Sequence, residues 1–270
     1  MKNGFDYFIR IAYDGTAYGG WQRQANHSRT IQQTIEESLS TVLGREIAIS
    51  GCGRTDAGVH ASQFYFYLNN PTELPTDFLF FMNKSSPADI AFLDAIPVTD
   101  KAHVCIDATL RTYDYFFHDF ADAWLSRTSS QIDLSNFRPE LTAQAIPQIL
   151  TRTNFREFCL TPDRLNSTIV NFSSVTLFRD RKKLRYRIRF VADRFLRGMI
   201  RILVSDLVKI GTEEMSFENF IAMLDVNARG KSVRLAPPNG LFLTGVSYPY
   251  ITREPDLPDC GQREWESIPS

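Results

Sequence analysis

The sequence lacks the features that place a chain in a membrane or direct it to secretion. Its 270 residues contain no run of about eighteen apolar residues, the length that a transmembrane helix needs. The opening residues, Met-Lys-Asn-Gly, are not followed by the apolar stretch of a secretory signal. We therefore expect no membrane association and a location in the cytoplasm.

Cysteine is scarce, and common cofactor motifs are missing. The four cysteines are widely scattered, with no CxxC pair and no histidine at metal-ligand spacing. We expect reduced, mostly buried thiols, and neither a disulfide framework nor a metal site. No dinucleotide or P-loop motif occurs, so no cofactor is expected. The cysteines are Cys52, Cys105, Cys159 and Cys260.

The charge that is present is unevenly distributed. Apolar residues make up 43% and charged residues 23%, as in globular proteins, and the net charge is −1. Of the 30 lysines and arginines, 10 lie between Arg179 and Arg201. Side chains two apart on a strand share a face, so Arg185, Arg187 and Arg189 are expected to point one way. A solvated face is the usual meaning of such charge, and we expect one strongly positive face on a protein that is nearly neutral overall.

Strand and helix signals alternate through the first hundred residues. Aromatic and β-branched residues predict a strand over Phe5–Tyr13. A helix is predicted after Thr30, because Thr30 and Gln33 match a capping box and apolar residues recur every three or four positions up to Gly44. Further elements are expected as strands at 47–50 and 63–68, a short helix at 76–82 and a strand at 90–96.

The same βαββαβ order can be traced a second time. The expected elements are a strand at 111–118, a helix at 138–150 interrupted at Pro147, strands at 170–178 and 184–191, a helix at 194–210 and a strand at 241–248. We predict an α+β fold of two related, ferredoxin-like βαββαβ halves, whose mainly antiparallel sheets form a central cleft. The predicted domains are 1–108 and 109–250, followed by a polar, loosely held tail at 251–270.

The loop at residues 51–61 concentrates ionisable side chains. Its sequence, GCGRTDAGVHA, contains three glycines, which allow sharp turns and the close approach of a ligand. Arg54, Asp56 and His60 crowd into seven positions. Taken alone, Arg54 and Asp56 are most simply read as a surface ion pair that contributes under about 1 kcal/mol.

The complete string changes that interpretation. Residues 53–61, GRTDAGVHA, resemble the active-site signature of the TruA family of tRNA pseudouridine synthases. Other stretches are similar to motifs of this family and occur in the same order. They are YDGT at 13–16, GWQ at 20–22, RTYDY at 111–115, the helix pattern from Phe195 to Arg201, and GLFL at 240–243.

The resemblance implies a role for each matching residue. Asp56 takes the place of the catalytic aspartate, and Tyr113 that of the tyrosine that packs against the target base and takes part in proton handling. Arg54 and Arg201 match basic residues near the site. From the residues alone, Tyr113 is more simply read as an ordinary strand tyrosine, and His60 and His103 are more simply read as structural.

The implied reaction suits these residue types. The bond from ribose to the base nitrogen breaks, the base turns and is rejoined through carbon, with no redox change. An ionised Asp56 either attacks the nucleoside covalently or assists glycal formation, and a guanidinium, which we assign to Arg201, favours the ionised form. The extruded base can stack on Tyr113, which returns roughly 1 to 3 kcal/mol, while Arg54 fills the vacated space or holds a phosphate.

The resemblance thus implies an isomerase for uridines of the tRNA anticodon stem-loop, acting as a homodimer without cofactor or metal. With RNA as the implied partner, we favour phosphate contacts for the three alternating arginines of the basic run. The match is uneven, because Cys105 and Asn171 stand where arginines are common and Ser205 where a glycine is common. Two alternatives stay open. One is the same chemistry on another RNA, and the other is an RNA-binding module without catalysis.

Overall fold

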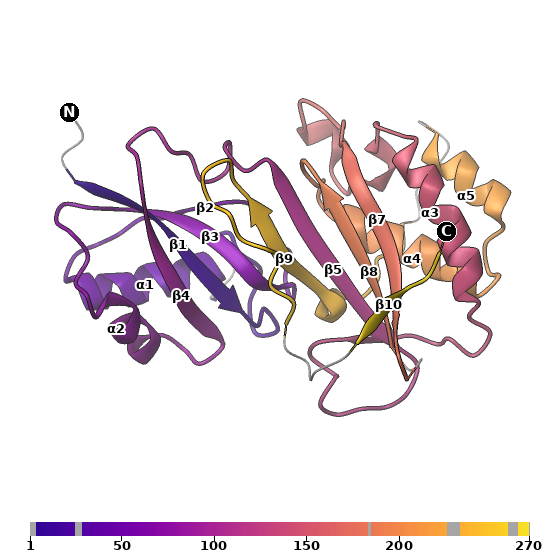
Figure 1. Cartoon of the computed structure of the whole chain (residues 1–270), viewed down its shortest axis with the longest axis horizontal. Helices are drawn as coiled ribbons and strands as arrows, with labels where there is room; N and C mark the ends of the chain where they lie inside the picture. The colour runs from indigo at the N-terminus through magenta and orange to yellow at the C-terminus, as the bar shows by residue number, and fades with distance from the viewer. Residues whose placement is uncertain (1–3, 25–28, 183–184, 226–232, 259–263, 270) are drawn as a thin grey trace. The chain divides into compact units, whose positions relative to one another are not determined.

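The computed structural model describes residues 4–24, 29–182, 185–225, 233–258 and 264–269 (Figure 1). The chain divides into two compact units. The first contains Met1–Thr109 and Phe242–Pro258, and the second contains Leu110–Leu241 and Asp259–Ser270. Within the described ranges, no helix is long and apolar enough to span a membrane. The prediction for Cys260 falls outside those ranges.

The sheet of the first unit is built on two long antiparallel strands, β1 (Phe5–Tyr13) and β3 (His60–Asn70). β4 (Ile90–Val98) is antiparallel to β1, and the short β2 (Ser50–Gly51) is antiparallel to β3. β9 (Leu241–Ser247) pairs in parallel with the beginning of β3. The strand order is β4-β1-β3-β2. β1 has its predicted bounds, whereas the strand predicted at 47–50 is wrong except at Ser50, where the two-residue β2 begins.

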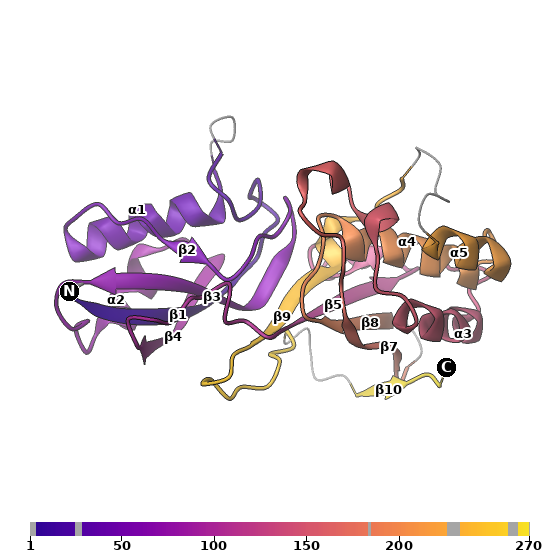
Figure 2. The ribbon, with the colours of Figure 1, turned by 90° about the horizontal axis from the view of Figure 1, so that it is seen from above.

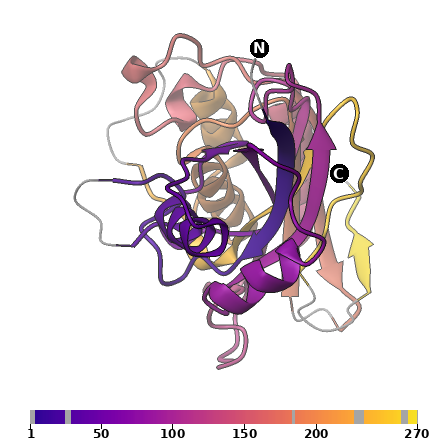
Figure 3. The same ribbon diagram turned by 90° about the vertical axis from the view of Figure 1, so that its left-hand side faces the viewer.

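Helices α1 (Ile31–Leu43) and α2 (Phe78–Ser85) lie on one side of these strands (Figures 2 and 3). The predicted ends of α1 are confirmed. The side chain of Thr30 accepts a hydrogen bond from the backbone N–H of Gln33 at 3.4 Å, and Gly44 ends the helix with a φ of 67°. Glycine adopts this left-handed conformation without the penalty that a Cβ imposes.

The sheet of the second unit has the order β10-β7-β8-β5, with all neighbours antiparallel. The predicted strands are confirmed with shifts of one or two residues at most of their ends, and residue 184 falls outside the described ranges. A short β6 (Ser130–Gln131) pairs in parallel with β5. The four main strands are β5 (Leu110–His118), β7 (Phe172–Asp180), β8 (Arg185–Ala192) and β10 (Trp265–Ser267).

Helices α3 (Pro139–Leu150), α4 (Met199–Gly211) and α5 (Phe217–Leu224) belong to the second unit. α4 and α5 lie on one side of β7 and β8 (Figure 2), and β10 extends the sheet at the edge of β7. Short 3₁₀ helices complete the unit at Arg156–Phe158, Pro162–Arg164 and Pro238–Gly240.

Two of the predicted helices were wrong in part. α3 is not interrupted at Pro147 but continues to Leu150, because the buried face around Ala143 and Ile146 holds it in place through the proline. α4 begins at Met199 rather than at residue 194. Gly198, just before it, has a φ of 74°, and a Cβ there would lie 2.8 Å from Leu160.

Along the chain, β1-α1-β2-β3-α2-β4 follows the order βαββαβ, and β5-α3-β7-β8-α4-β9 follows it with β6 and α5 as additional elements. The mixed α and β content with mainly antiparallel strands confirms the predicted α+β class. The relationship of the halves, the cleft and the domain bounds stay predictions. In the segment predicted as a tail, Asp256 pairs with Arg10 at 2.7 Å and Arg253 with Asp94 at 3.0 Å.

Candidate active site

Asp56 lies in the loop that connects β2 to β3 in the first unit. It begins a tight turn, in which its carbonyl accepts a hydrogen bond from the backbone N–H of Val59 at 3.1 Å. Gly58, within the turn, has a φ of 76°. Asp56 is half-buried and Arg54 is exposed. A carboxylate at such a position is accessible while its backbone is held.

The two N-terminal motifs pack directly behind this loop. The backbone N–H of Trp21 donates to the carbonyl of Thr55 at 3.1 Å, and a Cβ on Gly20 would lie only 2.6 Å from that carbonyl oxygen. The hydroxyls of Tyr13 and Thr55 are 2.9 Å apart, and both side chains are buried. These contacts explain structurally why YDGT and GWQ accompany the loop.

His60, at the start of β3, has a buried imidazole. Its Nδ1 lies 3.1 Å from the backbone N of Gly15 and 3.1 Å from Oδ1 of Asp14, and its ring stacks on Phe242 at 4.5 Å. The hydrogen bond from His60, assisted by hydrogen bonds from Thr16, holds the pKa of Asp14 below its ordinary value against the opposing effect of burial. These contacts agree with the structural role predicted for His60.

His103 also bonds to its local backbone. Its Nδ1 accepts from the N–H groups of Cys105 at 3.2 Å and Ile106 at 3.1 Å, as expected for a structural histidine. Of the cysteines in the described ranges, Cys52 and Cys159 are buried, as predicted for most of them, whereas Cys105 is exposed. Its position in an exposed turn explains the difference.

Tyr113 lies on β5 in the second unit and is half-buried. Its ring meets that of Phe195 edge to face, at 5.1 Å and 81°. Phe195 in turn packs on Phe172 at 5.8 Å. The aromatic residue of the predicted helix motif therefore supports Tyr113, although it precedes the helix itself.

Arg201 lies in the first turn of α4. Its Nε donates to the carbonyl of Ala236 at 2.7 Å, and the N–H of Ala236 donates to the carbonyl of Arg201 at 3.0 Å. The next carbonyl, that of Pro237, accepts from the hydroxyl of Tyr115 at 2.9 Å. The segment at 236–237 is thus bonded to both α4 and β5.

The four predicted site residues therefore form two pairs. Asp56 and Arg54 share one loop of the first unit, whereas Tyr113 and Arg201 belong to the second unit. That the two pairs act on one nucleoside stays a prediction.

The three alternating arginines of β8 share a face, but two of them are buried. Arg185 is 0% and Arg187 4% exposed. The Arg187 guanidinium lies 4.0 Å from the ring centre of Phe178 and 5.0 Å from that of Trp265, which also covers Arg185 at 6.0 Å. The prediction that these two contact phosphates is wrong for this structure, because aromatic rings occupy their faces.

An acidic partner for this face was missed by the sequence analysis. Asp114 is completely buried, and Arg189 donates to both of its carboxylate oxygens at 3.0 to 3.2 Å. Nη1 of Arg187 is 3.5 Å from the same carboxylate. Asp114 stands opposite Arg189 in the β5–β8 register, so the cross-strand pairing of opposite charges could have been found only with the register known.

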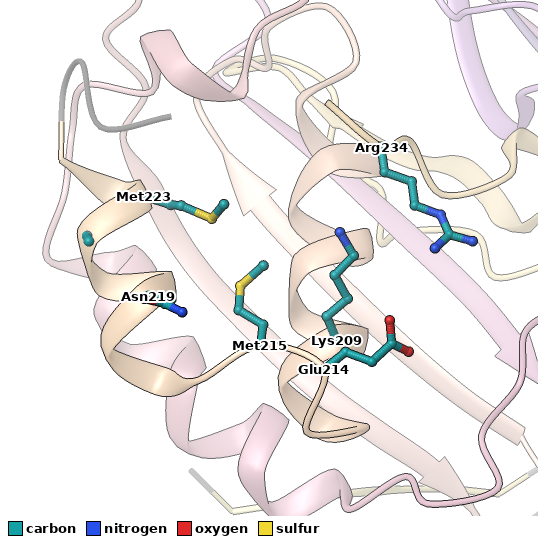
Figure 4. Close-up of a pocket in the computed structure, with 7 residues that line it drawn as sticks. Lys209, Glu214, Met215, Asn219, Met223 and Arg234 are labelled. Atoms are coloured by element: carbon teal, nitrogen blue, oxygen red, sulfur yellow. The ribbon is translucent and has the colours of Figure 1, made fainter. Parts of the chain in front are cut away.

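A cavity of about 610 Å³ lies within the second unit, between α4 and α5 (Figure 4). The two methionines on its wall point toward each other, and the Lys209 ammonium lies across from them. None of the predicted site residues lines it. Its lining includes Lys209, Glu214, Met215, Asn219, Met223 and Arg234.

Comparison with known proteins gives consistent matches over most of the chain. A family model described as tRNA pseudouridine synthase matches residues 9–106 and 146–249. A protein of Porphyromonas gingivalis named tRNA pseudouridine synthase A is 32% identical over 250 residues, which cover 90% of this chain and 97% of that protein. A protein of the same name from Bacteroides thetaiotaomicron is 33% identical over 248 residues, 90% of each chain. One from Clostridium acetobutylicum is 29% identical over 242 residues, 89% of this chain and 98% of that protein.

Proposed function

The chain belongs to the tRNA pseudouridine synthase family, and we propose that it isomerises uridine in the tRNA anticodon stem-loop with the carboxylate of Asp56 as nucleophile. Membership of this family makes the protein an isomerase that acts on RNA. The observation that carries the proposal is the half-buried Asp56, at the start of a turn whose preceding residue is held by both N-terminal motifs.

The chemistry requires a carboxylate that is ionised and fixed in direction. Asp56 attacks the ribose carbon, or assists loss of the base with formation of a glycal, as the bond to the base nitrogen breaks. The freed base turns, and its carbon bonds to the ribose carbon. In the covalent route this displaces the Asp56 carboxylate, and in the glycal route the ribose regains the proton that it gave up. The base carbon then loses its proton, and the base nitrogen gains one. Nothing is oxidised or reduced, because one carbon–nitrogen bond is exchanged for one carbon–carbon bond.

The remaining predicted residues have supporting roles in this proposal. Tyr113 packs against the extruded uracil, and base stacking of this kind is worth roughly 1 to 3 kcal/mol. Arg201 is the basic residue that we assign to the Asp56 carboxylate, since a guanidinium beside a carboxylate favours its charged form. Arg54, whose side chain is exposed, holds a phosphate or fills the space that the base leaves.

The wider architecture belongs to the same proposal. We propose that two related ferredoxin-like halves form a central cleft for RNA, that the chain acts as a homodimer, and that it works in the cytoplasm without a metal. The repeated βαββαβ order supports the two halves.

The direct test is Asp56→Asn, assayed by tritium release from tRNA labelled at the uracil carbon that forms the new bond. We expect tRNA affinity and thermal stability close to wild type and a rate lowered at least about a thousandfold. Asp100→Asn, an exposed aspartate of the same unit, is the matched control and should keep full activity. Activity retained by Asp56→Asn would remove this residue from the mechanism.

A second substrate is favoured by one departure from the family pattern. Asn171, which stands where an arginine is common, bonds its side-chain amide to Asp193 at 2.7 Å. A neutral, occupied amide offers less to a phosphate than a guanidinium does. Pseudouridine mapping in cells with and without the gene separates the substrates: an unchanged anticodon arm with loss elsewhere would indicate another RNA. Binding without tritium release from any tRNA would indicate a non-catalytic module.

A further inference from the structure

The residue just before the proposed nucleophile is held more tightly than a surface loop requires. Thr55 is 7% exposed, although it lies between the exposed Arg54 and the half-buried Asp56. Its carbonyl accepts from the N–H of Trp21 at 3.1 Å. Gly20 approaches the same carbonyl so closely that a Cβ would lie 2.6 Å away. The peptide that joins Thr55 to Asp56 is therefore fixed along one side.

The Thr55 side chain is fixed from a second direction. Its hydroxyl lies 2.9 Å from that of Tyr13, which is 4% exposed and ends β1. The Tyr13 ring packs on Phe64 at 5.7 Å, and Phe64 stacks on Trp21 at 4.0 Å. The hydroxyl pair thus ties the loop to a rigid strand and to the aromatic cluster beneath it.

We propose that the Tyr13–Thr55 hydroxyl pair is a positioning device that sets the direction of the Asp56 carboxylate. The proposal rests on the proposed function of Asp56. With its carbonyl and its side chain both held, Thr55 has little freedom about the bonds that lead to Asp56. Catalytic groups need to be held within roughly 0.5 Å, and a displacement of about 1 Å can lower a rate about a hundredfold.

The polarity of the pair distinguishes this role from packing alone. Two apolar side chains of similar size would fill the same space without fixing a direction. Two buried hydroxyls satisfy each other only in a narrow range of distances and angles. The bond therefore selects one rotamer of Thr55, which packing by shape alone would leave less well defined.

The test compares Thr55→Val and Tyr13→Phe with wild type in single-turnover tritium release at saturating tRNA. Each variant removes one hydroxyl and keeps the shape of the side chain. We expect each to lower the rate per folded enzyme about 10- to 100-fold, with tRNA affinity within about twofold of wild type. Thr55→Ser, which keeps the hydroxyl, should restore most of the rate. The double variant should be no slower than the slower single variant, because both remove one interaction.

Thr142→Val is the matched control for the loss of a buried threonine hydroxyl. Thr142 donates to the carbonyl of Leu207 at 3.0 Å, in the second unit. The Thr142→Val variant should be less stable than wild type but should release tritium at the wild-type rate per folded enzyme. Rates within twofold of wild type in Thr55→Val and Tyr13→Phe, or losses that multiply in the double variant, would overturn the proposal.

The same assay with Asp56→Asn separates this proposal from the function on which it rests. An inactive Asp56→Asn together with a fully active Thr55→Val refutes only the positioning role. An active Asp56→Asn refutes the nucleophile, and the positioning role with it. If Thr55→Val does not fold, Tyr13→Phe alone carries the comparison, because it leaves the loop sequence unchanged.

Discussion

Replacing Asp114 by asparagine should destabilise the second unit strongly. Asp114 is completely buried, and both of its carboxylate oxygens accept hydrogen bonds from Arg189. Nη1 of Arg187 lies 3.5 Å from the same carboxylate. Burial lowers the pKa of Arg187 to about 10, and the charge of Asp114 opposes that lowering. Asp114→Asn removes the negative charge and leaves the two guanidinium groups facing a neutral amide.

The size of the effect follows from the burial of the three groups. Breaking a buried ion pair by removing one partner costs about 3 to 5 kcal/mol. We expect the lower end, about 3 kcal/mol, because the Arg189 side chain is 24% exposed and can be partly solvated. For a protein of this size, 1 kcal/mol shifts Tm by about 2 to 4 °C, so Tm should fall by about 6 to 12 °C.

Urea unfolding followed by circular dichroism and tryptophan fluorescence measures the loss. Trp265 covers Arg187 and reports on this face. Asp163→Asn makes the same chemical change in the exposed pair with Arg156, where the aspartate side chain is 83% exposed, and should cost under about 1 kcal/mol. Equal losses in the two variants, or a loss for Asp114→Asn that disappears in 1 M salt, would refute the reasoning.

Three further variants test the loop and its support. A Cβ at Gly15 would lie 2.0 Å from the Val59 carbonyl oxygen, so Gly15→Ala should cost about 1 to 3 kcal/mol in urea unfolding. Gly53→Ala, with nothing within 4 Å, should stay within about 0.5 kcal/mol, and equal losses would contradict the predicted clash. The folded pKa of Asp14 is lowered by His60, so the stability it contributes is present above about pH 4 and is lost as pH falls below that value. The stability difference between wild type and Asp14→Asn should therefore shrink from pH 6 to pH 3, and a constant difference would exclude this linkage.

The first strand and the first helix could be predicted with their ends because their signals are local. The side chain of Thr30 accepts a hydrogen bond from the N–H of Gln33, only three residues away. Gly44 ends the helix because a glycine adopts the left-handed conformation without help from distant residues. The start of α4 could not be predicted in this way. The spacing of apolar residues continues backward past Gly198, so it does not mark the start of the helix. Gly198 has a φ of 74°, and a Cβ there would lie 2.8 Å from the side chain of Leu160, which is remote in the sequence.

In the candidate site, too, the local features could be predicted and the contacts between distant residues could not. The loop and Asp56 could be identified from a contiguous string, whereas the hydroxyl partner of Thr55 lies 42 residues away, on another element. The charge pattern of β8 correctly indicated one shared face. It could not indicate what covers that face, because Trp265 and Asp114 reach it through strand pairing that no local pattern encodes.

The buried arginines also change how the charge of this protein is to be understood. Part of the basic run is paired within its own unit, since Arg179 and Arg181 pair with Glu266 and Glu264, and Arg189 pairs with Asp114. A guanidinium already paired in this way releases no counterion when RNA binds, so it adds nothing to the salt dependence of binding. In the proposed function, attraction of the RNA backbone rests more on exposed cations, of which Arg54 is one. A count of basic residues along the sequence therefore overstates the charge that this protein can present to tRNA.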